Sequence, residues 1–467
     1  MERHPPGQER DRLLRPLSLE LTFEDRACAA LVTDERLLAA MARFEGALAQ
    51  ACAEADLVPA HAAQAIVAAC QQARFDPREL ALAARNAGTL AIPFVKALTA
   101  QVSARSEEAA RYVHLGATSQ DVTDTAAVLC MQDAAGRVLE LCDDLGDTLA
   151  ELASRHRDTP MAARTLLQPA APIPFGWKAA GWLSMLARSR EEFRASVRDA
   201  RALQFGGPAG TLSGYGERAP RVAAALARKL GLREPAIPWH SSRDRFARLG
   251  AAAALLTGSA ARIARDVSLL MQPEVGEALE PAAPGRGGSS SLPHKRNPAA
   301  SLLALEAALR APGLVATLFG QLVPEHERGL GQWQSQWFTL RTLVCGAASG
   351  LAAMAEVCAG LEVRAEAMQR NLDRSLGLVY SEAVAMRLSQ ALGKAAAHAK
   401  VEALCLEALQ SGTSLRELLA ADADVARAVP RDELARLFAP GSSFGAASVM
   451  IEAVLEEWRR ARAAPAI

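Results

Sequence analysis

The sequence predicts an all-α protein of three helical domains, the central one a bundle of long helices. Ala, Leu, Arg and Glu, which favour helices, dominate a chain of 467 residues of which only 4% are aromatic. Runs of β-branched residues are scarce, and we identify no strand ladder. Apolar residues at helical spacing recur through the middle of the chain, in stretches long enough for helices of several turns.

The first domain is expected over residues 1–112. Residues 34–56 and 60–73 have the apolar spacing of amphipathic helices, with breaks near Pro59 and Pro77. Before them, MERHPPGQERDRLLRP lacks the apolar core of a secretory signal, and the eight cysteines of the chain form no C-x-x-C pair. We therefore expect a cytoplasmic protein without a disulfide framework or a metal site.

The second domain, residues 113–364, is expected to contain the long helices. Between 126 and 153 apolar residues alternate spacings of four and three, the seven-residue repeat of a helix buried along one seam: Met131, Ala135, Val138, Cys142, Leu145, Leu149 and Leu152. Four more long helices are expected, over 174–204, 244–272, 299–322 and 333–360, with a bend at Pro312. The stretch 249–261 carries no charge, which favours cover by another subunit over burial within a monomer.

The third domain is expected over residues 365–467, where shorter amphipathic helices return. The whole chain has 52 basic and 52 acidic residues, so its formal net charge is zero. That balance argues against nucleic acid and membrane surfaces as partners. The longest uncharged stretches also fall short of the roughly 18 residues that a membrane span needs.

Three segments interrupt the helical pattern with reactive side chains. In 114–126, HLGATSQDVTDTA, Thr118 and Asp121 have the spacing of a capping box, and a helix start with free N–H groups and hydroxyls binds carboxylates. Ordinary capping explains the segment equally well. In 163–176, three prolines prevent a regular helix, and Thr165 and Gln168 offer neutral hydrogen-bonding groups; taken alone, this segment is a connector.

The third segment, GGSSSLPHKRNP (287–298), combines flexible glycines with hydroxyls and a cationic end. The spacing does not fit a phosphate-binding loop. Its chemistry suggests a lid that carries a hydroxyl to an anionic substrate, although a plain Gly/Ser linker has the same composition.

Residues 288–297 match the pattern G-S-S-x-[LM]-P-x-K-x-N, and in this the chain resembles the fumarase/aspartase superfamily. HLGATSQDVTDTA and RTLLQPAAP are similar to two other regions of that family, in the same order. The resemblance implies three α-helical domains, a homotetramer with each active site built from three subunits, and no metal or organic cofactor. It also implies that Ser289 transfers a proton next to a substrate carboxylate, with Lys295 and Asn297 assisting.

Within the superfamily the likeness is greatest to the bacterial cycloisomerases that lactonise 3-carboxymuconate in β-ketoadipate catabolism. PWHSSRDR, PEHERGLGQW and RNLDRSLGLVYSEAVA carry it further along the chain. Such a small-molecule polycarboxylate requires a cationic site. The resemblance implies these substrate-binding residues: His114, Thr118, Ser119, Thr165, Gln168, Ser290, His294 and Arg328. For His114 a structural hydrogen bond, and for Arg328 an ion pair, are the alternatives.

Two positions depart from the family pattern. Leu166 stands where relatives that expel an amine or a hydroxyl usually have His. Pro169 stands where many cycloisomerases have His. In addition, Trp239 replaces a Gln that is usual in adenylosuccinate lyases, which argues against a nucleotide substrate. Two alternatives remain open: a lyase that releases fumarate from an amino-succinyl substrate, and a non-catalytic structural relative.

Overall fold

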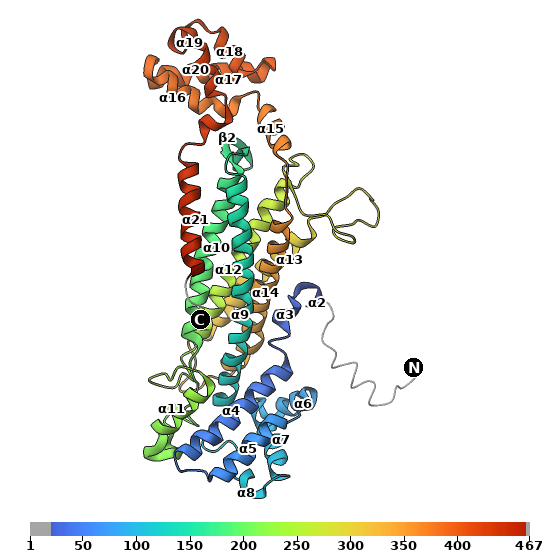
Figure 1. Ribbon diagram of the computed structural model, residues 1–467, viewed down its shortest axis with the longest axis vertical. Coiled ribbons are helices and arrows are strands. Elements are labelled where there is room, and N and C mark those ends of the chain that lie inside the picture. Colours follow the sequence, from blue (N-terminus) through green and yellow to red (C-terminus); the bar gives the residue numbers. More distant parts are fainter. Residues whose placement is uncertain (1–19, 464–467) are drawn as a thin grey trace.

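A computed structural model describes residues 20–463 as a long helical bundle with a group of smaller helices at each end (Figure 1). The predicted all-α class is confirmed. The amino-terminal stretch MERHPPGQERDRLLRP, which is expected to contain no secretory signal, lies outside the described residues.

The first two short helices, α2 (Glu20–Phe23) and α3 (Arg26–Ala29), lie against the side of the bundle (Figure 1). The helices that follow form one end of the molecule: α4 (Asp34–Glu54), α5 (Ala60–Gln72), α6 (Pro77–Ala87), α7 (Ala91–Ser103) and α8 (Glu107–Ala110). The predicted break at Pro77 is a helix start: Pro77 is the first residue of α6, and the Asp76 side chain accepts a hydrogen bond from Arg78 N. Further along the chain, η1 (Ser213–Arg218) leads into α11 (Ala219–Leu230), which packs on α4.

Five long helices form the bundle. They are α9 (Ser119–Arg155), α10 (Phe175–Ala200), α12 (Asp244–Leu270), α13 (Ala299–Gly320) and α14 (Gln332–Ala359). All seven residues of the predicted seam on α9 are buried, none more than 8% exposed, so the helix is held along that stripe. Pro312 lies inside α13, which continues through it.

The structure corrects the expectation that the chain has no strand ladder. β1 (Pro160–Thr165) pairs with β2 (Gln168–Pro174) as an antiparallel hairpin whose tip residues, Leu166 and Leu167, both have positive φ. The prolines that rule out helix are compatible with strands here, because both strands of a two-stranded hairpin are edge strands that leave one row of N–H groups unpaired. A second pair joins β3 (Ala278–Leu279) to β4 (Glu362–Val363).

The uncharged stretch 249–261 is mostly buried by its own bundle, since α12 packs against α10, α13 and α14. Leu255, at 55%, is its exposed large apolar residue. A larger exposed apolar face lies on α13, with Leu309 81% exposed. By length and composition α13 and α14 could each cross a membrane, but 72% of the apolar window of α14 is buried in the bundle, against 22% for α13.

Beyond the bundle the chain forms a group of short helices with a core of its own (Figure 1). The elements are α15 (Ala365–Asp373), η2 (Leu378–Tyr380), α16 (Ser381–Leu392), α17 (Lys394–Ser411), α18 (Leu415–Ala421), α19 (Ala423–Ala428), α20 (Arg431–Leu437) and η3 (Pro440–Ser443). The last helix, α21 (Ala447–Ala463), returns to the bundle, where Trp458 Nε1 donates to Asp147 2.8 Å away. The predicted tail, 365–467, thus contributes its final helix to the core of the bundle.

Candidate active site

The start of α9 carries the first group of predicted site residues. Thr118 is the N-cap, and its N–H donates to the Asp121 side chain over 3.0 Å, completing the predicted capping box. Thr118 and Ser119 are only partly buried. They stand at the start of a 37-residue helix, where the helix dipole favours an anion.

Asp121 also ties this helix start to a distant segment. Its buried carboxylate accepts hydrogen bonds from the N–H groups of Gly206 and Gly207, at 3.0 and 2.9 Å, and from Gln204 Nε2 at 3.0 Å. The ring of His240 lies 3.0 Å from the same carboxylate through Nε2. These bonds hold 204–207 against α9. This second role of Asp121 cannot be seen in the sequence, because only the fold brings its partners together.

A second buried network lies one turn further along α9. Arg243 donates to both oxygens of Asp124, at 2.6 and 3.1 Å, and both side chains are almost fully buried. Trp333 Nε1 and Gln120 Nε2 donate to the same carboxylate, each at 3.0 Å. These donors satisfy the buried Asp124 carboxylate, so its charge is not left unpaired. The same carboxylate orients Gln120 by accepting a hydrogen bond from its Nε2.

Gln120 in turn holds Arg328. The Arg328 Nε donates to Gln120 Oε1 over 2.9 Å, and Nη2 donates to Pro208 O over 3.3 Å. Both acceptors are neutral, and Arg328 makes no ion pair with the part of the chain that the structure describes. Its positive charge beside the start of α9 is therefore available to an anionic ligand.

His114 lies four residues before Thr118 and contacts a buried acid. Its Nδ1 is 2.6 Å from Oε1 of Glu45, a residue of α4 whose side chain is 0% exposed. Burial lowers the pKa of His114, but the charge and hydrogen bond of Glu45, with the charge of Asp121, raise it by more. The net effect is a raised pKa, which favours an imidazolium in this group of residues.

The loop 287–298 is closed at its neck. Asn297 N donates to Gly287 O over 2.8 Å, and Asn297 Nδ2 donates to Gly288 O over 3.3 Å. Gly287 has a φ of 65°, and a Cβ added there would collide with the carbonyl oxygen of Asn297. Below the neck, Glu280 caps α13 by accepting from Ser301 N at 2.8 Å. The loop therefore projects from a rigid base (Figure 1).

Within the loop, Ser289 accepts hydrogen bonds. Its Oγ lies 3.2 Å from Leu292 N and 3.4 Å from Ser291 N. Donors directed at an oxygen favour its anionic form, so the turn itself helps to stabilise a Ser289 alkoxide. Lys295, the source of positive charge suggested by the sequence, is exposed like Ser290 and His294, and its side chain contacts no partner among residues 20–463.

The third group lies at the tip of the β1–β2 hairpin. Thr165 and Gln168 are paired across the turn, and Leu166 between them is 97% exposed. Next to the tip, Arg164 fixes the hairpin by donating to both oxygens of the buried Glu277 at 2.7 and 2.8 Å. Trp239, in contrast, is 1% exposed and donates to Leu203 O, so the structure places it in the core.

The three groups do not meet within one chain. The 37 residues of α9 separate the group at its start from the hairpin beyond its end, a length of about 55 Å at 1.5 Å per residue. The loop 287–298 projects from the side of the bundle between them (Figure 1). Among residues 20–463 no cluster of three or more His, Cys, Asp or Glu is placed to hold a metal ion.

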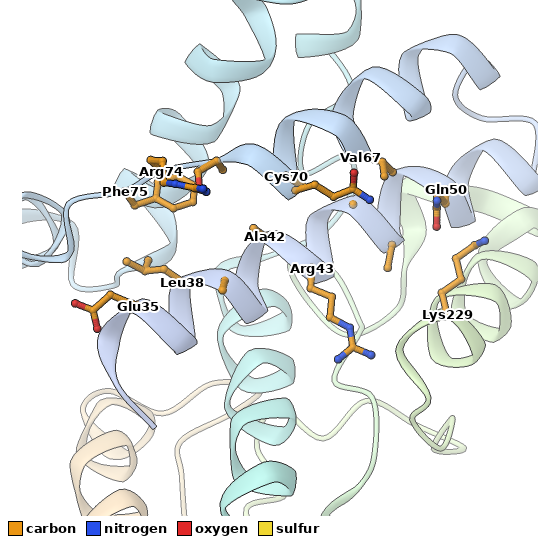
Figure 2. A pocket seen from close by; sticks show the side chains of 15 residues that line it. Glu35, Leu38, Ala42, Arg43, Gln50, Val67, Cys70, Arg74, Phe75 and Lys229 are labelled. Atoms are coloured by element: carbon orange, nitrogen blue, oxygen red, sulfur yellow. The ribbon is translucent and has the colours of Figure 1, made fainter. Parts of the chain in front are cut away.

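A cavity of about 610 Å³ lies elsewhere, between α4, the end of α5 and α11 (Figure 2). Arg43, Arg74 and Lys229 border it, and Cys70 is part of its lining. None of the predicted site residues lines this cavity, which is separate from the three groups described above.

Comparison with known proteins gives consistent matches along the chain. The family model described as "Lyase" matches residues 19–313, and the one described as "Adenylosuccinate lyase C-terminus" matches residues 377–454. A Bradyrhizobium diazoefficiens protein named 3-carboxy-cis,cis-muconate cycloisomerase is 47% identical, over 96% of this chain and 99% of its own. A nitrosuccinate lyase of Streptomyces davaonensis is 42% identical, over 91% of each chain.

Among solved structures, the 3-carboxy-cis,cis-muconate lactonizing enzyme of Pseudomonas putida superimposes with a TM-score of 0.91 at 42% identity. The match covers 95% of this chain and 99% of that one. The fold similarity therefore extends over nearly the whole length of both chains.

Proposed function

Since the chain belongs to the lyase family of the fumarase/aspartase superfamily, we propose that it is an enzyme that lactonises 3-carboxy-cis,cis-muconate to carboxymuconolactone. The observation that carries this proposal is the 47% identity, along nearly the full length of both chains, with a relative named for that reaction. The match between residues 288–297 and the superfamily pattern supports the proton-transfer chemistry on which this reaction depends.

The chemistry follows from the substrate. One carboxylate oxygen attacks the double bond and forms the C–O bond of the lactone, and the electron pair of that double bond moves onto the neighbouring carboxylate as an aci-form. Ser289 gives its hydroxyl proton to the adjacent carbon. Ser289 is then an alkoxide, which the N–H groups of Ser291 and Leu292 stabilise until it regains a proton from solvent. One proton is consumed per lactone.

The substrate carboxylates require cations and donors. His114 and Arg328, with the Thr118 and Ser119 hydroxyls, supply one binding region at the start of α9. Lys295, His294, Ser290 and Asn297 supply another on the loop, and Thr165 and Gln168 a third on the hairpin. Support comes from the raised pKa of His114 and from the neutral acceptors of Arg328.

We place this reaction in a cytoplasmic homotetramer whose active sites are shared between subunits. Three features support shared sites: the separation of the three groups, the exposed hairpin tip, and the exposed apolar face of α13. The cytoplasmic assignment rests on the eight cysteines, all of which are free thiols.

A second candidate substrate is nitrosuccinate. It is suggested by the relative named nitrosuccinate lyase and by Leu166, which provides no proton donor for a leaving group. Nitrite, like the carboxylate released when a lactone opens, is a weak base that leaves without protonation. Elimination would move a proton from the CH2 carbon, next to the carbon that bears the nitro group, to a Ser289 alkoxide while the C–N bond breaks, giving fumarate and nitrite.

The test is a substrate panel with the purified full-length protein. We expect loss of the absorbance of 3-carboxymuconate with uptake of one proton per molecule, followed with a pH indicator. Adenylosuccinate, argininosuccinate and aspartate should give no turnover. Faster release of nitrite from nitrosuccinate than loss of carboxymuconate would favour the second candidate, and cleavage of adenylosuccinate alone would overturn both.

A further inference from the structure

The ring of His114 is held by its surroundings. The residue has a φ of 58°, in the left-handed region. The next residue, Leu115, accepts a hydrogen bond from the Tyr215 hydroxyl through its carbonyl oxygen, and Gly116 lies against the ring of Tyr215 with no room for a Cβ. The backbone around His114 is therefore fixed, and Nδ1 points to α4.

The side chain that contacts Nδ1 of His114 is a fully buried glutamate. Glu45 is 0% exposed at its side chain, Oε1 lies 2.6 Å from His114 Nδ1, and the buried Oε2 has no hydrogen-bond partner among the described residues. A carboxylate in this position is costly unless a cation lies beside it. The group in contact with it is the imidazole of His114.

The other titratable groups around the pair carry no positive charge. They are Cys52 on α4, Cys70 on α5, Tyr215 on η1 and Asp121 on α9. Burial raises the pKa of each thiol to about 12 and raises that of Tyr215 as well, so all three are neutral at pH 7. The Asp121 carboxylate adds negative charge, and its oxygens are occupied by the 204–207 segment.

We propose that Glu45 is a positioning residue that keeps His114 doubly protonated and directs its Nε2–H at a substrate carboxylate. Nε2 has no hydrogen-bond partner among residues 20–463, and the side chain is 17% exposed. Which carboxylate is bound there rests on the proposed function; the charge state of the pair does not. Glu45 acts through His114 and does not touch the substrate.

The proposal predicts the direction of a pH effect. Burial alone lowers the pKa of His114, and the charge of Glu45 is the main influence that raises it. A neutral residue at position 45 leaves the effect of burial largely unopposed. The imidazole then loses its proton, and with it one bond to the substrate, at a lower pH than in the wild type.

The experiment compares Glu45→Gln and Glu45→Asp with Glu54→Gln. Glu54 is on the same helix, but its exposed side chain pairs with Arg228 and Lys229 and not with His114. Its variant is therefore the matched control. We expect Glu45→Gln to raise KM at neutral pH roughly tenfold, the usual effect of losing a charged hydrogen bond. Its kcat should stay within about threefold, and Glu45→Asp should recover part of the lost affinity.

Two readouts separate this role from a merely structural one. Across about pH 5 to 9, the rise of KM with pH should start at least about one pH unit lower in Glu45→Gln than in the wild type. An NMR titration of the histidine rings, with the His114 signal assigned by His114→Asn, should show the same shift without any substrate.

Several results would overturn the proposal. An equal rise of KM at every pH, or a fall of kcat with KM unchanged, would reduce Glu45 to a packing residue. An unchanged titration of His114 in Glu45→Gln and Glu45→Asp would remove its electrostatic role. If the wild type fails to lactonise carboxymuconate, the proposed function fails, but the substrate-free titration still decides the role of Glu45.

Discussion

The local backbone geometry around Ser289 supports its proposed role in proton transfer. A serine hydroxyl is a poor acid and a poor base in water, so a role in proton transfer needs a surrounding that tolerates its alkoxide. The turn over 289–292 provides two N–H donors to Oγ without help from any other element.

Replacing Ser289 by Ala should lower kcat by about 10² to 10⁴, the usual loss when a proton-transfer group is removed, while the substrate still binds. Steady-state turnover and equilibrium binding measure the two effects. Ser291→Ala is the matched control, because it removes a hydroxyl from the same turn but keeps the N–H that faces Ser289. Activity of Ser289→Ala within threefold of wild type would exclude Ser289 as the proton donor.

Leu166→Gln should leave lactonisation within about tenfold of wild type, because a carboxylate that attacks or leaves needs no proton donor opposite Ser289. The carboxylic acid has a pKa near 4 and is ionised at pH 7. The measurement is kcat/KM for carboxymuconate in both proteins. Efficient cleavage of an amino-succinyl substrate by the wild type would show that a donor is supplied from elsewhere.

At the scale of elements, the loop 287–298 combines a fixed neck with an exposed tip. Gly287 and Asn297 close the neck through a backbone hydrogen bond, and Glu280 fixes the start of the helix that follows. The tip residues 290–296 are exposed. Such a loop can move as a unit over a substrate and exclude water, which suits an alkoxide mechanism.

Gly287→Ala should lower kcat/KM by roughly tenfold or more, since a Cβ at a φ of 65° is strained by about 1 to 2 kcal/mol and meets the Asn297 carbonyl as well. Gly288→Ala is the neighbouring control, because nothing lies within 4 Å of a Cβ built there. Steady-state kinetics should rank the two variants in that order. A milder effect at position 287 than at 288 would contradict the importance of the neck.

At the scale of the whole molecule, one chain presents the parts of a site at separate places. The start of α9, the loop and the hairpin tip cannot reach the same small ligand along a bundle built on a helix of about 55 Å. The apolar side of α13 and the hairpin tip both remain exposed in a single chain. Packing of copies through these surfaces would bury them and could bring the three groups together.

Leu309→Asp should therefore break the proposed tetramer and abolish activity together, because a charge at a buried subunit contact is costly. Leu309 is 81% exposed in the single chain, so the substitution should leave the fold of the subunit intact. Light scattering and circular dichroism measure assembly and fold. Leu406→Asp, on α17 of the carboxy-terminal group, is the control and should remain assembled; an active monomer of Leu309→Asp would refute shared sites.

The sequence alone determined the helical class, the five long helices and the buried seam of α9, because apolar periodicity and capping are local properties of the chain. It also predicts which loops carry chemistry, through the pattern at 288–297 and the capping box at Thr118. It could not show that a Pro-rich segment forms a hairpin, since strand pairing depends on a partner segment and not on local preference.

The tertiary structure decided what depends on residues far apart in the chain. Glu45 meets His114 across 69 positions, and Gln120 meets Arg328 across 208. Neither Glu45 nor Gln120 stands out in its own segment, where each is one polar residue on a helix. Only packing shows that the uncharged stretch 249–261 faces its own bundle while α13 remains open. Burial and charge pairing depend on which residues the fold brings into contact. The sequence can predict them only where the partners are neighbours in the chain.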